Sequence, residues 1–348
     1  MMIEIQKLKN WKAPRDWVEI QTIDAHTGGE PLRIIISGFP NLKGETLLEK
    51  RASAKNDFDQ FRKAIMWEPR GHADMYGAII VPPDTPNADF GVIFIHNEGY
   101  STGCGHAVIA LTKAFIETGL IKKTEPITKI GMDVPSGFIR SFAELKNGEI
   151  KSIGFLNVPS YVQQMDATID VPGLGNIRYD LAFGGAFYAF VDVDQFNLDC
   201  TQEYHSELID KGMLIKKTML KSITMDHPTN PEMNFLYGVI FVGAPKESSN
   251  HSRNVCIFAE GEVDRSPTGT GVSARAAIHY ARGDINIGES ITIESIIDST
   301  FSVKVNETTT FGKYKAVIPE VRGTAFLTGK NSFWINPNDP LKDGFILR

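Results

Sequence analysis

Apolar residues in the first third of the chain fall into short runs, rich in β-branched side chains and separated by turns, which predicts strands. Two of these runs flank Gly28-Gly29 and are typical of a β-hairpin. Residues 47–67 differ, because their apolar side chains recur at helical spacing, and Pro69 ends that predicted helix. The strands predicted here span residues 17–23, 34–36, 76–81 and 90–96.

A segment that is apolar nearly all round follows, between Tyr100 and Gly119. Ser101 or Thr102 is a suitable N-cap for a helix there, and Gly119 suits the position just beyond its C-terminus. Because no face of this helix is polar, the sequence predicts that it is buried rather than lying on a surface.

The second half of the chain is rich in predicted strands and holds one further helix of this kind, at residues 267–283. Its start, Thr268-Gly-Thr-Gly-Val272, matches Cys104-Gly-His-Ala-Val108 at an offset of 164 residues. A repeat this long predicts two duplicated domains, each a strand-rich layer round one buried helix, with both helix N-termini facing the same place. The predicted strands span residues 150–158, 181–193, 235–242, 254–260, 289–297, 301–305 and 314–319.

Composition is that of a globular protein. The 348 residues are 42% hydrophobic and 22% charged, enough to build one or two cores. The balance of 36 basic against 42 acidic residues argues against a nucleic-acid binder. No apolar run approaches the roughly 18 residues of a membrane span, and the charged N-terminus lacks the apolar stretch of a signal peptide. We therefore expect a cytoplasmic protein with no nucleic-acid or membrane partner.

The three cysteines exclude a disulfide scaffold and leave a thiol for chemistry. Cys104 stands at a predicted helix start, where unpaired N–H groups and the helix dipole lower a thiol pKa and attract anions. A buried structural cysteine is the competing interpretation, and the surrounding glycines and His106 weigh against it. Cys200 and Cys256, in a polar stretch and in mid-strand, are interpreted as structural.

Two polar residues near the helix starts are further candidates. His106 follows the thiol by two residues, and Asp264 precedes the second helix, where a carboxylate would suit a substrate ammonium. The alternative for Asp264 is a surface residue paired with Arg265. No spacing of histidine, cysteine and acidic residues matches a metal site, and no nucleotide fingerprint occurs, so we expect neither a metal nor another cofactor.

Four motifs make the sequence resemble the proline racemase family. They are Asp24-Ala-His-Thr-Gly-Gly-Glu-Pro31, Glu68-Pro-Arg-Gly-His-Ala-Asp-Met-Tyr-Gly77, Ser101-Thr-Gly-Cys-Gly-His-Ala107 and Asp264-Arg-Ser-Pro-Thr-Gly-Thr-Gly271. The resemblance implies an α/β fold of the diaminopimelate epimerase type, with two pseudo-symmetric domains and the active site between them. The expected first domain spans residues 1–148 plus 336–348 and carries Cys104; the second spans residues 149–335 and carries Asp264 and Thr268.

The resemblance also implies a mechanism. Racemases and epimerases of the family use two cysteines, one on each face of the substrate α-carbon. Here the first is Cys104, but the second position holds Thr268, whose hydroxyl is too weak an acid to supply a resting base. This departure resembles the branch that dehydrates trans-3-hydroxy-L-proline to pyrroline-2-carboxylate. The substrate-binding residues implied are Gly105, His106, Asp264, Gly269 and Thr270.

Several alternatives stay open at this stage. Within the family these are a proline racemase and a 4-hydroxyproline 2-epimerase. Outside it, they are a cysteine hydrolase that uses Cys104 with a histidine, and an inactive amino-acid-binding protein. The expected partner is a small amino acid; the sequence leaves the oligomeric state open, with a homodimer among the options.

Overall fold

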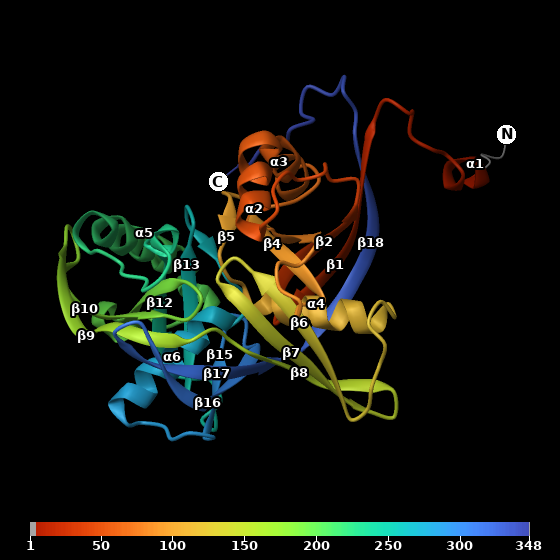
Figure 1. Cartoon of the computed structure of the whole chain (residues 1–348). Helices are drawn as coiled ribbons and strands as arrows, with labels where there is room; N and C mark the ends of the chain where they lie inside the picture. The colour runs from red at the N-terminus through yellow and green to blue at the C-terminus, as the bar shows by residue number, and fades with distance from the viewer. Residues whose placement is uncertain (1–4, 348) are drawn as a thin grey trace.

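Two barrels of strands, each round one helix, make up the computed structural model of this chain (Figure 1). It describes residues 5–347, apart from the side chain of Gln6. The first four residues, on which part of the signal-peptide prediction rests, lie outside the described residues. No helix within residues 5–347 is both long enough and apolar enough to cross a membrane.

The first barrel surrounds helix α4 (Gly105–Glu117), of which eleven of thirteen residues are buried. Neighbouring strands are antiparallel, except for the parallel pairs β2–β3 and β4–β6. In order round the barrel the strands are β18 (Ala325–Ile335), β1 (Val18–Thr27), β2 (Glu30–Ser37), β3 (Tyr76–Val81), β4 (Phe90–His96), β6 (Ile127–Val134), β7 (Gly137–Lys146) and β8 (Glu149–Leu156).

The second barrel repeats this order round helix α6 (Gly269–Arg282). Its parallel pairs, β11–β12 and β13–β15, fall at the corresponding places, and β17 pairs with β9 to close it. The strands are β9 (Ser160–Val171), β10 (Gly175–Phe183), β11 (Phe187–Asp192), β12 (Leu236–Gly243), β13 (Ser252–Phe258), β15 (Ser290–Glu294), β16 (Thr300–Phe311) and β17 (Tyr314–Gly323). The predicted α/β fold with two pseudo-symmetric halves is confirmed.

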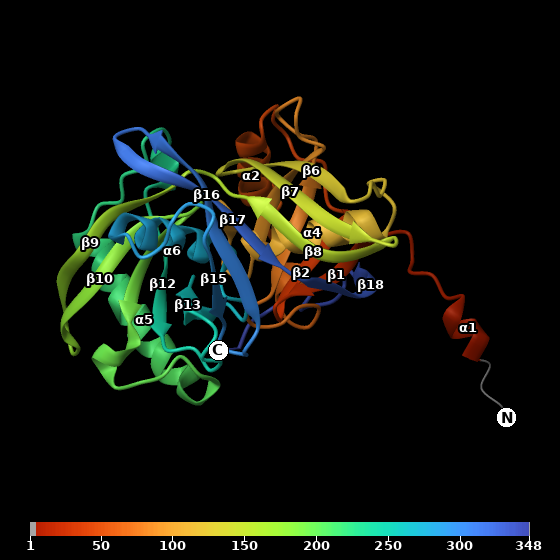
Figure 2. The same ribbon diagram turned by 90° about the horizontal axis from the view of Figure 1, so that it is seen from below.

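Other helices pack against the barrels. Helices α2 (Leu47–Asp57) and α3 (Asp59–Met66) pack on the first barrel, and α5 (His205–Ser222) packs on the second (Figure 2). The remaining elements are α1 (Ile5–Lys9), the two-residue strands β5 (Tyr100–Ser101) and β14 (Glu262–Val263), and the 3-10 helices η1 (Val193–Phe196), η2 (Gln202–Tyr204) and η3 (Pro231–Met233).

Several predicted elements need correction. The helix expected at 47–67 is two helices that meet at Phe58. The strand expected at 181–193 is interrupted by Gly184-Gly185, because the backbone there approaches α6 too closely for a side chain: a Cβ on Gly184 would lie 2.2 Å from the Thr270 carbonyl oxygen. The N-cap of α4 is Cys104 itself, not Ser101 or Thr102.

Strand pairing also moves the domain boundaries. Strand β8 pairs with β7, and β18 pairs with β1, so both belong to the first barrel. The boundaries expected at 148/149 and 335/336 put these two strands in the second domain. We place the domain boundaries instead at residues 157–159 and 323–324. Because β8 also pairs with β17, the two barrels share a hydrogen-bonded seam.

The two buried helices meet end to end at their N-termini. A Cβ built on Gly105 would lie 2.5 Å from the Cα of Gly269, and a Cβ on Gly269 would lie 2.5 Å from the Cα of Gly105. Backbone atoms cannot move aside to make room for a Cβ, as the end of a flexible side chain can. Glycine at both positions is therefore what permits this contact.

We predict that Gly269→Ala destabilises the fold by about 1–3 kcal/mol, the usual cost of overpacking, despite the higher helix propensity of alanine. Urea denaturation measures the change. Gly99→Ala is the matched control, since no atom lies within 4 Å of a Cβ built there. Equal stabilities of the two variants would contradict the close contact.

Candidate active site

A small cavity lies where the two helix N-termini meet. All seven residues predicted for the site line it, although they come from two segments of chain more than 150 residues apart. These residues are Cys104, Gly105, His106, Asp264, Thr268, Gly269 and Thr270. The other lining residues are Glu30, Tyr76, Gly103, Tyr188, Tyr237, Cys256 and Phe258.

Cys104 is the N-cap residue of helix α4, with an extended backbone, and its Sγ lies 3.2 Å from Nδ1 of His106. Burial raises the pKa of this thiol well above its usual range, although the backbone N–H of Ala107 acts in the opposite direction. A helix start alone predicts a lowered pKa for this thiol. In the structure the thiol is buried, and the desolvation of the thiolate is the larger effect.

Burial also lowers the pKa of His106, to about 3. The ring is therefore neutral at physiological pH, and Cys104 and His106 do not form a thiolate–imidazolium pair. The neutral imidazole can still form hydrogen bonds with the thiol or a ligand, but it lacks the second ring proton that an imidazolium would give away as an acid. Its main-chain carbonyl accepts a hydrogen bond from Thr27, which fixes the first turn of α4 against the β1–β2 hairpin.

Thr268 caps α6 as Cys104 caps α4, but with a strained backbone. Its φ is +67°, in a region that β-branched residues rarely adopt. Its Oγ1 is buried and has no hydrogen-bond partner among the described residues. The hydroxyl of Thr270, by contrast, is 2.6 Å from the Tyr188 hydroxyl. Strain and an unsatisfied polar atom at one residue are features that concentrate at functional sites.

The carboxyl group of Asp264 turns into the cavity and is 6% exposed. Its Oδ1 accepts a hydrogen bond from the Ser266 N–H at 2.8 Å, while burial raises its pKa to about 6. The alternative of a surface pair with Arg265 is wrong. The Arg265 side chain is directed to Glu30 and to the main-chain carbonyl of Asp74.

Seven lining residues have no role in the site predicted from the sequence. Glu30 and Tyr76 lie inside two of the motifs that carry the family resemblance, so their positions in those motifs could have marked them as site residues. Tyr188, Tyr237 and Phe258 come from apolar strands whose pattern marks only burial. Cys256 is predicted to be structural. It is fully buried in β13, and it also lines the cavity.

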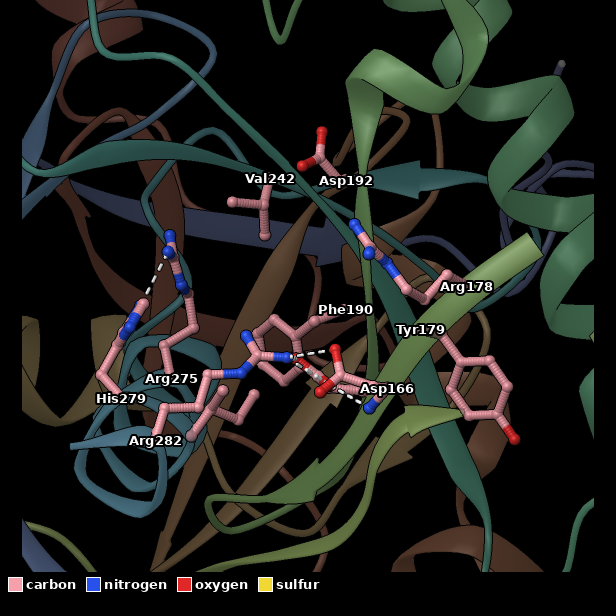
Figure 3. Close-up of a pocket in the computed structure, with 11 residues that line it drawn as sticks. Asp166, Arg178, Tyr179, Phe190, Asp192, Val242, Arg275, His279 and Arg282 are labelled. Atoms are coloured by element: carbon pink, nitrogen blue, oxygen red, sulfur yellow. Dashed lines mark hydrogen bonds and ion pairs between the residues drawn. The ribbon is translucent and has the colours of Figure 1, made fainter. Parts of the chain in front are cut away.

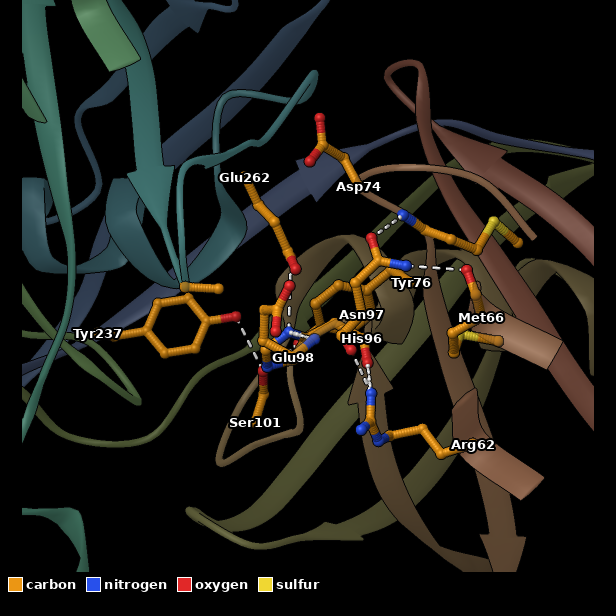
Figure 4. A network of polar contacts seen from close by, with 12 residues as sticks. Arg62, Met66, Asp74, Tyr76, His96, Asn97, Glu98, Ser101, Tyr237 and Glu262 are labelled. Carbon is orange, nitrogen blue, oxygen red and sulfur yellow. Dashed lines mark hydrogen bonds and ion pairs between the residues drawn. The ribbon is translucent and has the colours of Figure 1, made fainter. Parts of the chain in front are cut away.

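A chain of hydroxyls joins the two barrels beside the cavity. Tyr76 donates to Ser101, whose Oγ is 2.8 Å from the hydroxyl of Tyr237 (Figure 4). Behind Tyr76, the side chain of Asn97 binds the main chain of Met66 and Met75, which holds α3 against the strand that carries Tyr76. This network fixes the wall of the cavity from outside.

A larger polar pocket lies along the C-terminal half of α6 (Figure 3). Within it, Arg282 pairs with Asp166 and Asp180 at 2.9 Å, and the Arg275 guanidinium lies 2.9 Å from Nε2 of His279. Neither the thiol nor a helix N-terminus reaches it. Within residues 5–347, no cluster of three or more histidine, cysteine or acidic side chains is arranged to hold a metal ion.

The geometry suits a small amino acid. Two helix N-termini offer N–H groups to a carboxylate, Asp264 offers a negative partner to an ammonium, and Cys104 lines the same cavity. An amino acid held by these groups would have its α-carbon in the cavity that the thiol lines. The arrangement can therefore remove an α-proton while the N–H groups stabilise the charge that develops on the carboxylate.

Comparison with known proteins agrees with this geometry. A family profile described as proline racemase matches residues 22–346. The trans-3-hydroxy-L-proline dehydratase of Colwellia psychrerythraea is 49% identical, over 98% of this chain and 97% of its own length. A 3-hydroxyproline 2-epimerase of Burkholderia multivorans is 44% identical, over 94% of this chain and 98% of its own. A crystal structure of a hydroxyproline epimerase from Agrobacterium vitis, with trans-4-hydroxy-L-proline bound, matches with a TM-score of 0.90 at 32% identity and 96% coverage of both chains.

The raised pKa of Asp264 predicts a pH-dependent cost to the fold. Burial favours the protonated carboxyl group of Asp264 over its carboxylate. The stability that the protonated form contributes is therefore fully present below about pH 4 and is lost as the pH rises through about 6. Asp264→Asn keeps the hydrogen-bond acceptor and removes the titration. We expect its free energy of unfolding, relative to the parent protein, to increase by up to about 3 kcal/mol between pH 4 and 7.

Urea denaturation across that pH range measures this difference. Asp170→Asn, a change at an exposed position of β9, is the control and should follow the parent curve. A stability difference between Asp264→Asn and the parent that stays constant with pH would contradict the assignment.

Proposed function

This chain belongs to the proline racemase family, and on that premise we propose that it dehydrates trans-3-hydroxy-L-proline to pyrroline-2-carboxylate, with Cys104 as its single general base. The observation that carries the proposal is the pair of helix caps: a thiol on one side of the cavity and a threonine, Thr268, on the other. Inversion at the α-carbon needs a base on each face, and a threonine hydroxyl does not ionise at neutral pH.

Substrate binding uses both barrels. The carboxylate would lie between the backbone N–H groups of Gly105 and His106 on one side and of Gly269 and Thr270 on the other. Asp264 would hold the ring ammonium. The positive charge of that ammonium, brought beside a buried thiol, also lowers the cost of forming the thiolate.

Elimination then needs only one face of the ring. In trans-3-hydroxy-L-proline the hydroxyl is opposite the carboxylate, so it lies on the same face as the α-hydrogen. Cys104 takes that hydrogen as a proton, the C2–C3 double bond forms, and the hydroxyl takes up a proton from an acid on the same face and leaves as water. The enamine product tautomerises to pyrroline-2-carboxylate. No step transfers electrons to an acceptor, so the scheme uses no cofactor.

The principal alternative is an epimerase, since one relative carries the name 3-hydroxyproline 2-epimerase. Thr268 favours the dehydratase, because an epimerase needs a second acid to return a proton from the opposite face. Cytoplasmic location and a small-molecule amino acid as the only ligand complete the proposal.

Proton NMR of the purified protein with trans-3-hydroxy-L-proline tests the function directly. Dehydration removes the signal of the C3 carbinol proton and produces the signals of pyrroline-2-carboxylate. Retention of that signal with the appearance of the cis isomer would instead identify an epimerase.

Cys104→Ser should lower the dehydration rate by about 10²–10⁴-fold, the usual contribution of a general base, because a serine hydroxyl is a far weaker acid than a thiol. The fold should stay intact. Cys200→Ser is the matched control: Cys200 is also buried but does not line the cavity, so turnover should change little. If Cys104→Ser keeps activity within about tenfold, or 1.4 kcal/mol of barrier, the base is another group.

Thr268→Cys should create a second thiol on the opposite face of the substrate. Cysteine is not branched at Cβ, so it fits the strained cap position at least as well as threonine. We expect this variant to convert L-proline slowly to D-proline, whereas the parent exchanges the α-proton without inversion.

Chiral chromatography after long incubation in deuterated water measures the yield of D-proline. Inversion by the parent protein at a rate comparable to its dehydration would exclude the one-base scheme. A low yield from the variant is weaker evidence, since a thiol misplaced by about an ångström loses on the order of 10²-fold in rate.

A further inference from the structure

Glu30 is the one carboxyl group of the cavity to which no role has been given. It is the first residue of β2, directly after the Gly28-Gly29 turn, and its side chain is 0% exposed. It lines the cavity together with Cys104 and Asp264. A buried carboxyl group in a catalytic cavity costs stability unless it is neutral or fully hydrogen-bonded, so its presence needs a functional reason.

The two oxygens of this carboxyl group differ. Oε2 accepts a hydrogen bond of 2.8 Å from the main-chain N–H of Arg265, and the Arg265 guanidinium lies 3.5 Å from the same atom. Oε1 is buried and has no hydrogen-bond partner among the described residues. Since Oε2 serves as the acceptor, a proton on this group resides on Oε1, the oxygen that remains available to a ligand.

Charge also favours a protonated Glu30. Burial and the neighbouring Asp264 raise the pKa of Glu30 well above its usual range. A zwitterionic amino acid brings one positive group, which a charged Asp264 balances, and one negative group, which the helix N-termini receive. The Arg265 guanidinium, 3.5 Å from Oε2, acts in the opposite direction, but it also faces Asp74 and the burial of the Glu30 carboxylate is the larger effect, so Glu30 is the group that keeps its proton.

We propose that Glu30 is the general acid of the dehydration, delivering the proton on Oε1 to the 3-hydroxyl of the substrate as the C3–O bond breaks. This inference rests on the proposed function. Glu30 comes from the first barrel, as Cys104 does, which is the side on which both the α-hydrogen and the hydroxyl of the trans substrate must lie. His106 cannot take this role, because its ring is neutral.

The α-proton passes to Cys104, the electron pair of the C–H bond forms the C2–C3 double bond, and the C3–O pair leaves with oxygen. The proton of Glu30 joins that oxygen to give water. The enzyme is left with a thiol at Cys104 and a carboxylate at Glu30. After product release the thiol loses a proton to solvent and Glu30 gains a proton from solvent, which restores the starting state.

Glu30→Gln tests the role, since an amide of the same shape cannot transfer a proton. Two reactions are compared: dehydration of trans-3-hydroxy-L-proline, and exchange of the α-proton of L-proline with deuterated water, which needs Cys104 but no leaving group. We expect dehydration to fall by about 10²–10⁴-fold, while exchange stays within about tenfold of the parent. Glu30→Asp, which keeps an acidic proton, should recover part of the dehydration rate.

A better leaving group provides a second readout. Fluoride departs with far less help from an acid than hydroxide, so Glu30→Gln should release fluoride from trans-3-fluoro-L-proline nearly as fast as the parent. Glu262→Gln is the matched control: Glu262 is equally buried but does not line the cavity, and the ratio of dehydration to exchange should remain that of the parent.

The outcomes separate the two proposals. If the parent does not dehydrate trans-3-hydroxy-L-proline, the proposed function fails, and the role of Glu30 with it. If the parent dehydrates it and Glu30→Gln does so within tenfold, the acid is another group and the function stands. If dehydration and exchange fall equally in Glu30→Gln, the residue shapes the cavity and is not the acid.

Discussion

The close approach of two helix N-termini is the constraint on which the rest of the structure depends. Gly105 and Gly269 lie so near each other that a Cβ on either would overlap the backbone of the other. Each barrel buries one of these helices. The hydrogen-bonded pair of strands β8 and β17 joins the two barrels and so holds the two helices in position relative to each other. Bringing two positive helix ends together is unfavourable without an anion, so the arrangement stores binding energy for a carboxylate.

The cavity keeps several polar groups without partners. Oε1 of Glu30 and Oγ1 of Thr268 are buried and unsatisfied among the described residues, and burial shifts the pKa values of Cys104 and Asp264 upward. Each of these features costs stability. A bound zwitterion would supply the missing partners, which explains how a site with such poor internal hydrogen bonding can be compatible with a stable fold.

Catalytic asymmetry arises from a symmetric scaffold. The pseudo-repeat places Cys104 and Thr268 at equivalent caps, yet one barrel presents an ionisable thiol and the other a hydroxyl. The two barrels also differ inside. Leu111 and Phe115 pack α4 with apolar side chains, whereas Arg275 and His279 occupy the corresponding positions of α6. The two halves therefore share one backbone arrangement, and different residues at a few equivalent positions give each half a different role.

The sequence by itself determined the two buried helices, their equivalence at an offset of 164 residues and the cysteine and threonine at their starts. These follow from local signals: continuous apolar composition, glycine beside a polar cap, and repeated motifs. It did not reveal α5, an amphipathic surface helix with a weak pattern, or that β8 and β18 belong to the first barrel. Strand partners are chosen by contacts between distant segments.

Only the tertiary structure decided the electrostatics of the site. A helix start in isolation lowers the pKa of a thiol, but the closure of two barrels over Cys104 removes water and raises it. The same packing directs Arg265 to Glu30, and it leaves Oε1 of Glu30, a residue that lines the cavity, buried and without a hydrogen-bond partner among the described residues. Burial and long-range hydrogen bonds set these properties, and neither is encoded within any short stretch of sequence.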